Sequence, residues 1–183
     1  MEYELIRSDR RTIGIEISEN GLKVRAPFNM PDKVINKFLN EKKDRIEKNL
    51  EKFRQRKAAS ENIPPLTAEE ITVLADKAMK VIPERVAFYA PIVGVTYGRI
   101  TIRNQQTRWG SCSAKGNLNF NCLLMLTPPE VVDSVVVHEL CHRKEMNHSP
   151  AFYKEVLRVY PNYIECDKWL KKNGNLIMSR MKK

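Results

Sequence analysis

The chain has 183 residues, of which 42% are hydrophobic, and it carries a formal net charge of +10. This length and composition indicate one domain, or one domain with an appended subdomain, able to bury a sizeable core. There is no long apolar run, which excludes a transmembrane helix, and the first residues lack the basic-then-apolar layout of a secretory signal peptide.

The N-terminal end is predicted to form a β-meander. Three stretches alternate in polarity or are β-branched and are typical of strands: residues 3–8, 12–18 and 22–28. The first turn falls at residues 9–11. The second, at residues 19–21, contains Asn20-Gly21, a strong hairpin signal.

A long helix is expected next, from Pro31-Asp32 to about Ser60. Its apolar stripe at three-to-four spacing consists of Val34, Ile35, Phe38, Leu39, Ile46, Leu50 and Phe53. The proline-containing linker at residues 62–65 then separates two predicted parts. Residues 1–62 hold the meander and the long helix, and residues 63–183 hold a second domain, with the two forming one compact unit.

The second part is predicted to begin with a helix and a small antiparallel sheet. The sequence T-A-E-E at residues 67–70 is a capping box, and the helix that it starts is expected to break or kink at Pro83 and to continue to Ala90. The strands that follow are expected at residues 98–103, 108–112 and 117–126, with a turn at 113–116. An edge strand of such a sheet can pair with an extended peptide.

All three histidines of the chain lie in one stretch, V-V-V-H-E-L-C-H-R-K-E-M-N-H, which ends at His148. His138 and His142 are four residues apart, so a helix places both imidazoles on one face. This helix is expected to run from Pro128 to Lys144, with a capping box at residues 127–130. His148 is expected in the joint before a second helix, for which Ser149 is the N-cap.

This spacing predicts a catalytic zinc site. Three histidine ligands leave the fourth position of a tetrahedral zinc open for water, and Glu139 follows the first ligand as a general base would. We therefore expect amide hydrolysis by Glu-assisted attack of zinc-bound water. A glutamate as third ligand, Glu155 or Glu165, is the weaker alternative.

Other side chains are expected around this site. Tyr153, Tyr163 and Arg108 are candidates for oxyanion stabilisation, and the sequence does not choose between them. Trp109 is expected to be a packed wall residue near the site. The last helices are expected at residues 150–160 and 163–172, the second ending at Asn173-Gly174.

Three blocks in this order resemble the YgjP-like metallopeptidases, which are related to the WLM and SprT-like zinc proteases. The blocks are T-R-W-G-S-C-S at Thr107–Ser113, V-V-H-E-L-C-H at Val136–His142 and N-H-S-P-A-F-Y at Asn147–Tyr153. The resemblance implies an α+β, zincin-like metallopeptidase domain in which His138, His142 and His148 hold zinc and Glu139 is the base. The histidine spacing also matches that of metzincins, but Glu145 stands where that pattern has glycine, so the turn must be made differently.

Three functions remain open at this point. A peptidase acting on peptides or proteins is favoured. Some relatives of the resembled family are described as UTP pyrophosphatases, but no phosphate-cradling glycine loop is visible. A SprT-like, nucleic-acid-associated protease would explain the basic runs at residues 42–57 and 168–183, which otherwise are solvated helix faces. The charge predicts weak, salt-sensitive binding of nucleic acid or nucleotide.

The number and spacing of the four cysteines indicate the cellular compartment of the protein. Cys112, Cys122, Cys141 and Cys166 form no C-x-x-C pair and are too few for a disulfide scaffold. We therefore expect reduced thiols and a cytoplasmic protein.

Overall fold

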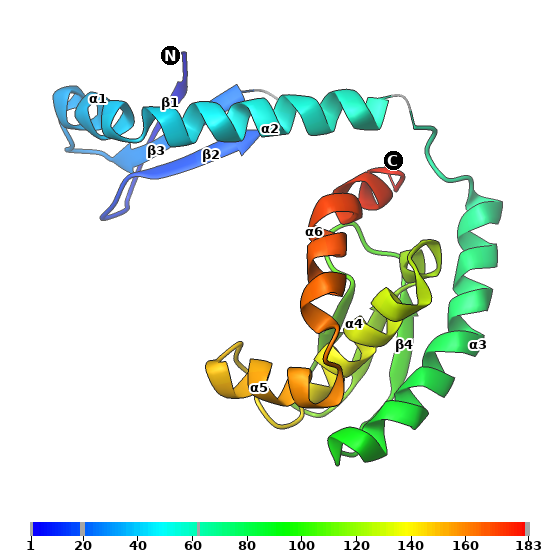
Figure 1. The fold of residues 1–183 in the computed structure, drawn as a ribbon. Coiled ribbons are helices and arrows are strands. Elements are labelled where there is room, and N and C mark those ends of the chain that lie inside the picture. The colour runs from blue at the N-terminus through cyan, green and yellow to red at the C-terminus, as the bar shows by residue number, and fades with distance from the viewer. Residues whose placement is uncertain (1, 19–20, 62, 182–183) are drawn as a thin grey trace. The chain divides into compact units, whose positions relative to one another are not determined.

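The computed structural model of the chain describes residues 2–18, 21–61 and 63–181, and it is an α+β protein (Figure 1). The chain divides into two compact units, residues 1–62 and 63–183, and each is described by itself. Among the described residues, no helix is long and apolar enough to cross a membrane.

The first unit contains a three-stranded sheet of β1 (Glu4–Ser8), β2 (Gly14–Ser18) and β3 (Gly21–Pro27). The predicted meander is wrong: the order is β1-β3-β2, with β1 parallel and β2 antiparallel to β3. Leu22, Val24 and Ala26 make β3 the most buried strand, so it takes the central position. The pairing of β2 with β3 confirms the hairpin, whereas its turn at residues 19–20 lies outside the described residues.

The predicted long helix is two helices, α1 (Asp32–Glu41) and α2 (Lys43–Glu61), interrupted at Lys42. The interruption falls in a run of six polar residues, N-E-K-K-D-R at 40–45, where no apolar side chain holds the helix against the sheet. Ile35, Leu39 and Ile46 are buried against the sheet, but Val34, expected in the same stripe, is 48% exposed.

The second unit begins with α3 (Ala68–Val93). Its capping box is confirmed: the Glu70 amide donates to Thr67 Oγ1 over 3.1 Å, and the Thr67 amide donates to the Glu70 carboxylate over 2.8 Å. The helix does not stop at Pro83 or at Pro91 but ends where Gly94 adopts φ 77°. Proline at 83 removes the donor for the carbonyl of Met79, an exposed residue, so water can satisfy that carbonyl.

The second sheet consists of β4 (Ile100–Arg103), β5 (Gly110–Cys112) and β6 (Leu118–Asn121). It is mixed and not purely antiparallel as predicted, because β4 runs parallel to β6 while β5 runs antiparallel to it. The order β4-β6-β5 repeats that of the first sheet, again with the most buried strand in the centre. Among the described strands, β4 and β5 are therefore the edges.

The predicted strand at residues 117–126 ends early, and Cys122–Leu126 form a 3-10 helix, η1. Asn121 explains the change: its Oδ1 accepts from the Leu123 amide over 3.0 Å, which caps the new turn. Its Nδ2 donates to the carbonyls of Gln105 and Arg108 over 2.7 and 2.9 Å. Asn121 is thus buried and hydrogen-bonded, although it is a polar residue.

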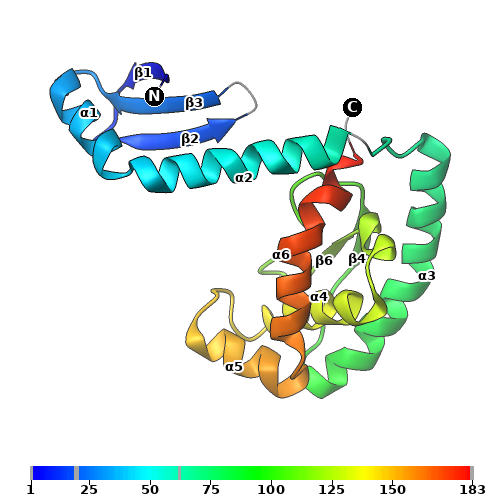
Figure 2. The same cartoon turned by 45° about the horizontal axis from the view of Figure 1, so that its top comes forward.

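Three helices complete the second unit: α4 (Pro129–Cys141), α5 (Pro150–Val159) and α6 (Tyr163–Ser179). Figure 2 shows α4 between α3 and α6, and it also contacts α5 and β5. The predicted capping box of α4 is wrong, because the Thr127 hydroxyl donates to the Leu124 carbonyl of η1 over 2.8 Å and Pro128 is the N-cap.

Helix α5 begins at the predicted residue, whereas α6 ends later than predicted. At α5 the cap is confirmed, since Ser149 Oγ accepts from the Phe152 amide over 3.2 Å. Helix α6 continues past the predicted end at Gly174, which lies buried inside it. A β-carbon on Gly174 would lie 3.1 Å from Trp109 Cζ2, so glycine serves close packing there and does not end the helix.

Candidate metal centre

Helix α4 carries the first two histidines of the candidate metal centre. Its valines are buried, and this fixes the helix in the core of the second unit. His138 lies in the last turn, and His142 is the C-cap in a right-handed helical conformation, so the two rings remain one turn apart. Their ring centroids are 4.9 Å apart.

The third histidine comes back to the first two from the segment between α4 and α5. His148 is exposed, and its ring centroid lies 4.9 Å from that of His138 and 4.8 Å from that of His142. No described residue except glycine has a positive φ, so this reversal needs no left-handed residue. It is helped by the Glu145 amide, which donates to the Cys141 carbonyl over 3.0 Å.

The three histidines fit a metal ion. Their ligand nitrogens all lie within 4.8 Å of one another, and Nε2 of His138 is 3.0 Å from Nε2 of His148. Two ligands of one tetrahedral zinc, each about 2.0–2.1 Å from the ion, lie about 3.3 Å apart. The donor set of three imidazoles suits zinc and other late transition ions.

In His138 and His142, the ring nitrogen Nδ1 contacts another group of the protein. Nδ1 of His142 donates to the Glu145 carbonyl over 3.0 Å, so its Nε2 carries the lone pair that a metal needs. Nδ1 of His138 is 2.9 Å from the Tyr163 hydroxyl. Such outer contacts orient the ligand rings of metal sites.

Phe152 is a site residue that the sequence reasoning did not identify. Its side chain is fully buried, and its ring centroid lies 4.9, 4.6 and 4.9 Å from those of His138, His142 and His148. The signal was available, because Phe152 and Val156 form the apolar stripe of α5 directly after the third histidine.

Burial sets the protonation of the histidines. Desolvation, followed by the charges of His142 and His148, lowers the pKa of His138 to about 3. Burial also lowers the pKa of His142. Both imidazoles are therefore neutral at pH 7, which is the form that binds metal.

Glu139 lies beside the triad under strand β5. Its side chain is 5% exposed, and burial raises its pKa to about 8, opposed by the charge of Arg108. A β-carbon built on Gly110 would lie only 2.6 Å from Glu139 Oε1, so any larger residue at this point of β5 would collide with the carboxyl. Gly110 was not recognised from the sequence.

A pocket of about 290 Å³ opens next to these groups. It is lined by His138 and Glu139 and by three of the predicted site residues, Arg108, Trp109 and Tyr163. The fourth, Tyr153, is 41% exposed, and its ring centroid lies 6.1 Å from that of His148. All four therefore lie around the triad.

The two glutamates considered as third ligands lie in ion pairs elsewhere. Glu155 binds Lys144 and Arg158 over 2.6 and 2.7 Å, and Glu165 binds Lys168 over 2.8 Å. Among the described residues, neither glutamate is part of the group that can hold a metal ion.

Replacing Gly110 by alanine is expected to lower hydrolysis about 100-fold or more, because the added methyl displaces the Glu139 carboxyl and misplacement by about 1 Å costs this much. Metal binding should remain, since no ligand is touched. Peptide cleavage and bound metal are to be measured together, with Ser111→Ala on the same strand as the control. Wild-type activity in Gly110→Ala would contradict the close approach.

The ion pairs of Glu155 predict a pH-dependent contribution to stability. Hydrogen bonds from Arg158 and then from Lys144 lower the pKa of this carboxyl from 4.5 to about 2. Because the folded pKa is below the unfolded one, the stabilisation is present above about pH 4.5 and is lost as the pH falls toward 2.

We therefore expect Glu155→Gln to lower the free energy of unfolding by about 1 kcal/mol at pH 7, a modest value because both cations are partly exposed. Urea denaturation at pH 7, 5 and 4 should show the difference shrinking at the lowest pH. The exposed pair of Glu165 provides the control, for which Glu165→Gln should change stability by less than about 0.5 kcal/mol. A difference that grows as the pH falls would contradict this account.

Two solved structures, both archaeal metallopeptidase zymogens, are similar to part of this chain. Abylysin of Pyrococcus abyssi is 23% identical with a TM-score of 0.46, over 50% of this chain and 94% of that chain. Jannalysin of Methanocaldococcus jannaschii is 27% identical with a TM-score of 0.44, over 53% of this chain and 98% of that chain. A comparison with curated proteins found no match.

A family model matches both units of the chain. The model describes the YgjP-like metallopeptidase domain and matches residues 11–77 and 61–173. Together these ranges contain most of the chain, including the triad, Glu139 and strand β5. The chain therefore belongs to the YgjP-like metallopeptidase family.

Proposed function

We propose that this chain is a zinc-dependent peptidase in which Glu139 is the general base. The observation that carries the proposal is the position of the Glu139 carboxyl, which is buried between the His138–His142 helix and the glycine of edge strand β5.

The zinc ion that we propose for the three histidines would supply a Lewis acid, and its positive charge would lower the pKa of water and of the nearby carboxyl. His142 and His138 present neutral rings to it, and the Glu145 carbonyl and the Tyr163 hydroxyl hold these rings in place.

Glu139 then moves a proton twice. Its carboxylate takes a proton from the attacking water and delivers it to the amine that leaves. Burial gives this carboxyl a high proton affinity, while the charge of Arg108 favours its ionised form. A base whose pKa is near the working pH is the most effective in both steps.

Strand β5 is proposed to position the substrate. It pairs only with β6 among the described strands, so its other edge is available to an extended peptide. The backbone of Gly110 lies over Glu139, and a peptide paired with this edge would bring its carbonyl to the metal centre. For the oxyanion we propose Tyr153 or Arg108, because the Tyr163 hydroxyl is already within hydrogen-bonding distance of His138.

A paired assay tests this proposal. Zinc-loaded protein is incubated with peptide libraries and, separately, with nucleoside triphosphates including UTP, and chelator-treated protein is the control. We expect zinc-dependent peptide cleavage and no release of pyrophosphate. Zinc-dependent cleavage of triphosphates with intact peptides would overturn the peptidase in favour of a pyrophosphatase.

A further inference from the structure

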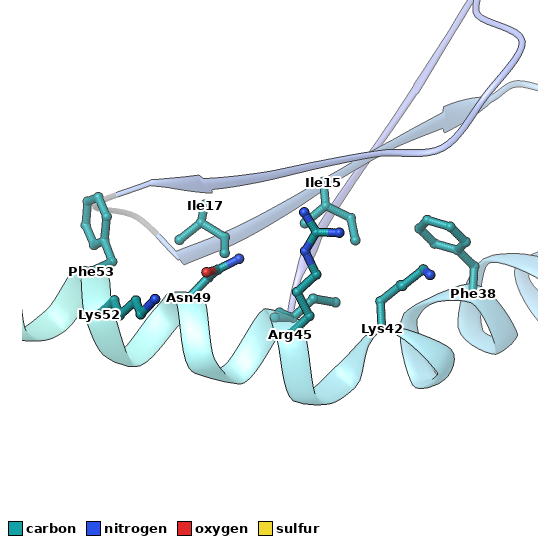
Figure 3. A pocket seen from close by; sticks show the side chains of 9 residues that line it. Ile15, Ile17, Phe38, Lys42, Arg45, Asn49, Lys52 and Phe53 are labelled. Atoms are coloured by element: carbon teal, nitrogen blue, oxygen red, sulfur yellow. The ribbon is translucent and has the colours of Figure 1, made fainter. Parts of the chain in front are cut away.

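A groove of about 550 Å³ lies in the first unit, between strand β2 and helices α1 and α2 (Figure 3). Half-buried isoleucines of β2, Ile15 and Ile17, line one side. Figure 3 shows Phe38 and Phe53 at the two ends, with the polar side chains of α2 between them. None of the residues that line the groove belongs to the metal centre.

Three of the four polar side chains that line the groove are cationic. Lys42, Arg45 and Lys52 line it together with Asn49, and all of them are exposed. Arg45 and Lys52 are seven residues apart and therefore share one face of α2. No carboxylate lines the groove, and none of the three cations forms an ion pair with a carboxylate of the described residues.

The opposite flank of α2 carries both signs of charge. A second groove there, of about 860 Å³, is lined by Glu47, Glu51 and Arg54 of α2 and by Glu2 and Glu4 near the start of the chain. The groove beside β2 differs because its described lining holds three cations and no carboxylate, so it attracts an anion in particular.

The aromatic side chains of the groove indicate which kind of anion it binds. Phe38 packs against the core of the first unit, but Phe53 does not belong to that cluster although it is half-buried in the groove. A phenyl ring next to a row of unpaired cations is the combination by which proteins bind single-stranded nucleic acid, with bases stacked on the ring and phosphates on the cations.

We propose that this groove binds single-stranded nucleic acid without sequence preference. Lys42, Arg45 and Lys52 contact successive phosphates, and one base stacks on Phe53. An acidic peptide would satisfy the cations but would leave the ring without a planar partner. A duplex keeps its bases stacked on one another, so it offers nothing to the ring either.

Fluorescence anisotropy of the full chain with a labelled 12-nucleotide DNA of mixed sequence tests this proposal between 25 and 200 mM salt. Three phosphate contacts predict a slope of about −2 in a plot of log affinity against log salt. The triple variant Lys42→Gln, Arg45→Gln, Lys52→Gln should bind at least about 10-fold more weakly and with a slope closer to zero.

The matched control removes the same charge outside the groove, at the exposed residues Lys33, Lys37 and Lys48. This triple glutamine variant should retain binding within about 3-fold of the parent protein. Equal losses in both triple variants would show that only the net charge attracts DNA, and the groove would be rejected as the site.

A second variant tests the stacking. Phe53→Leu keeps an apolar side chain but removes the ring, and it should weaken single-strand binding at least about 5-fold, the low end for one stacked base. Duplex DNA and a poly-glutamate peptide of equal charge complete the experiment. If either binds as tightly as the single strand, or if Phe53→Leu binds like the parent, the assignment to single-stranded nucleic acid is wrong.

Discussion

Replacing Glu139 by glutamine is expected to lower peptide hydrolysis at least about 100-fold, the low end for the contribution of a general base. Glutamine keeps the shape of the side chain and its hydrogen-bonding capacity, so it fits beneath Gly110 as glutamate does. It cannot accept the proton of the attacking water. Adjacent positions on a helix diverge by about 100°, so the side chain next to His138 is not expected to bind the metal directly.

Folding and metal binding should therefore be unchanged in Glu139→Gln. Zinc affinity, thermal unfolding and initial rates on a confirmed peptide substrate are to be measured on the same preparation. Full activity in this variant would mean that the carboxylate is not the base, and water would have to be activated by another route. Loss of zinc together with activity would instead make Glu139 part of the metal site.

Replacing His148 by alanine is expected to weaken zinc binding by more than about 100-fold. Changes to groups that only orient a metal ligand typically cost about 10- to 100-fold in affinity, and a ligand itself should cost more. His148 is exposed and lies outside α4, so its removal should leave the helix and the core intact. His138→Ala should have an effect at least as large, because its Nε2 is 3.0 Å from that of His148.

Tyr163→Phe provides a graded comparison, since it removes only the hydroxyl next to Nδ1 of His138. We expect this variant to fall between the parent and His148→Ala, within the range for orienting groups. Competition with a chromophoric chelator measures all three affinities. If His148→Ala binds zinc like the parent, the third ligand is not this histidine.

The candidate site was more predictable from the sequence than the fold around it. Metal ligation requires particular side chains at particular separations along the chain, so the spacing of His138, His142 and His148 was sufficient to bring them together. The sequence also predicted the helix N-caps correctly at Thr67 and Ser149, where the side-chain hydroxyl accepts from a backbone amide of the first helical turn. At Thr127 the same signal failed, because the carbonyl of Leu124 offers the hydroxyl another partner.

The order of the strands within each sheet could not be predicted from the sequence. The alternation of polar and apolar residues shows which side chains share one face of a strand, but it does not show which strands pair with each other. In both sheets the third strand lies between the first two, where its apolar side chains are buried most completely. Gly110 was not predicted for a related reason. The need for a glycine above Glu139 arises from a contact between strand β5 and helix α4, which are far apart in the sequence. Phe152, by contrast, was readable from the apolar stripe that follows His148.

The most direct test of this account is a titration of chelator-stripped protein with zinc, in which bound metal and peptide cleavage are followed in the same samples. We expect both to rise together and to level off at about one zinc per chain, and neither to do so in His148→Ala. Peptide cleavage by the stripped protein at the full rate, or failure of the stripped protein to retain zinc, would contradict a catalytic metal at His138, His142 and His148.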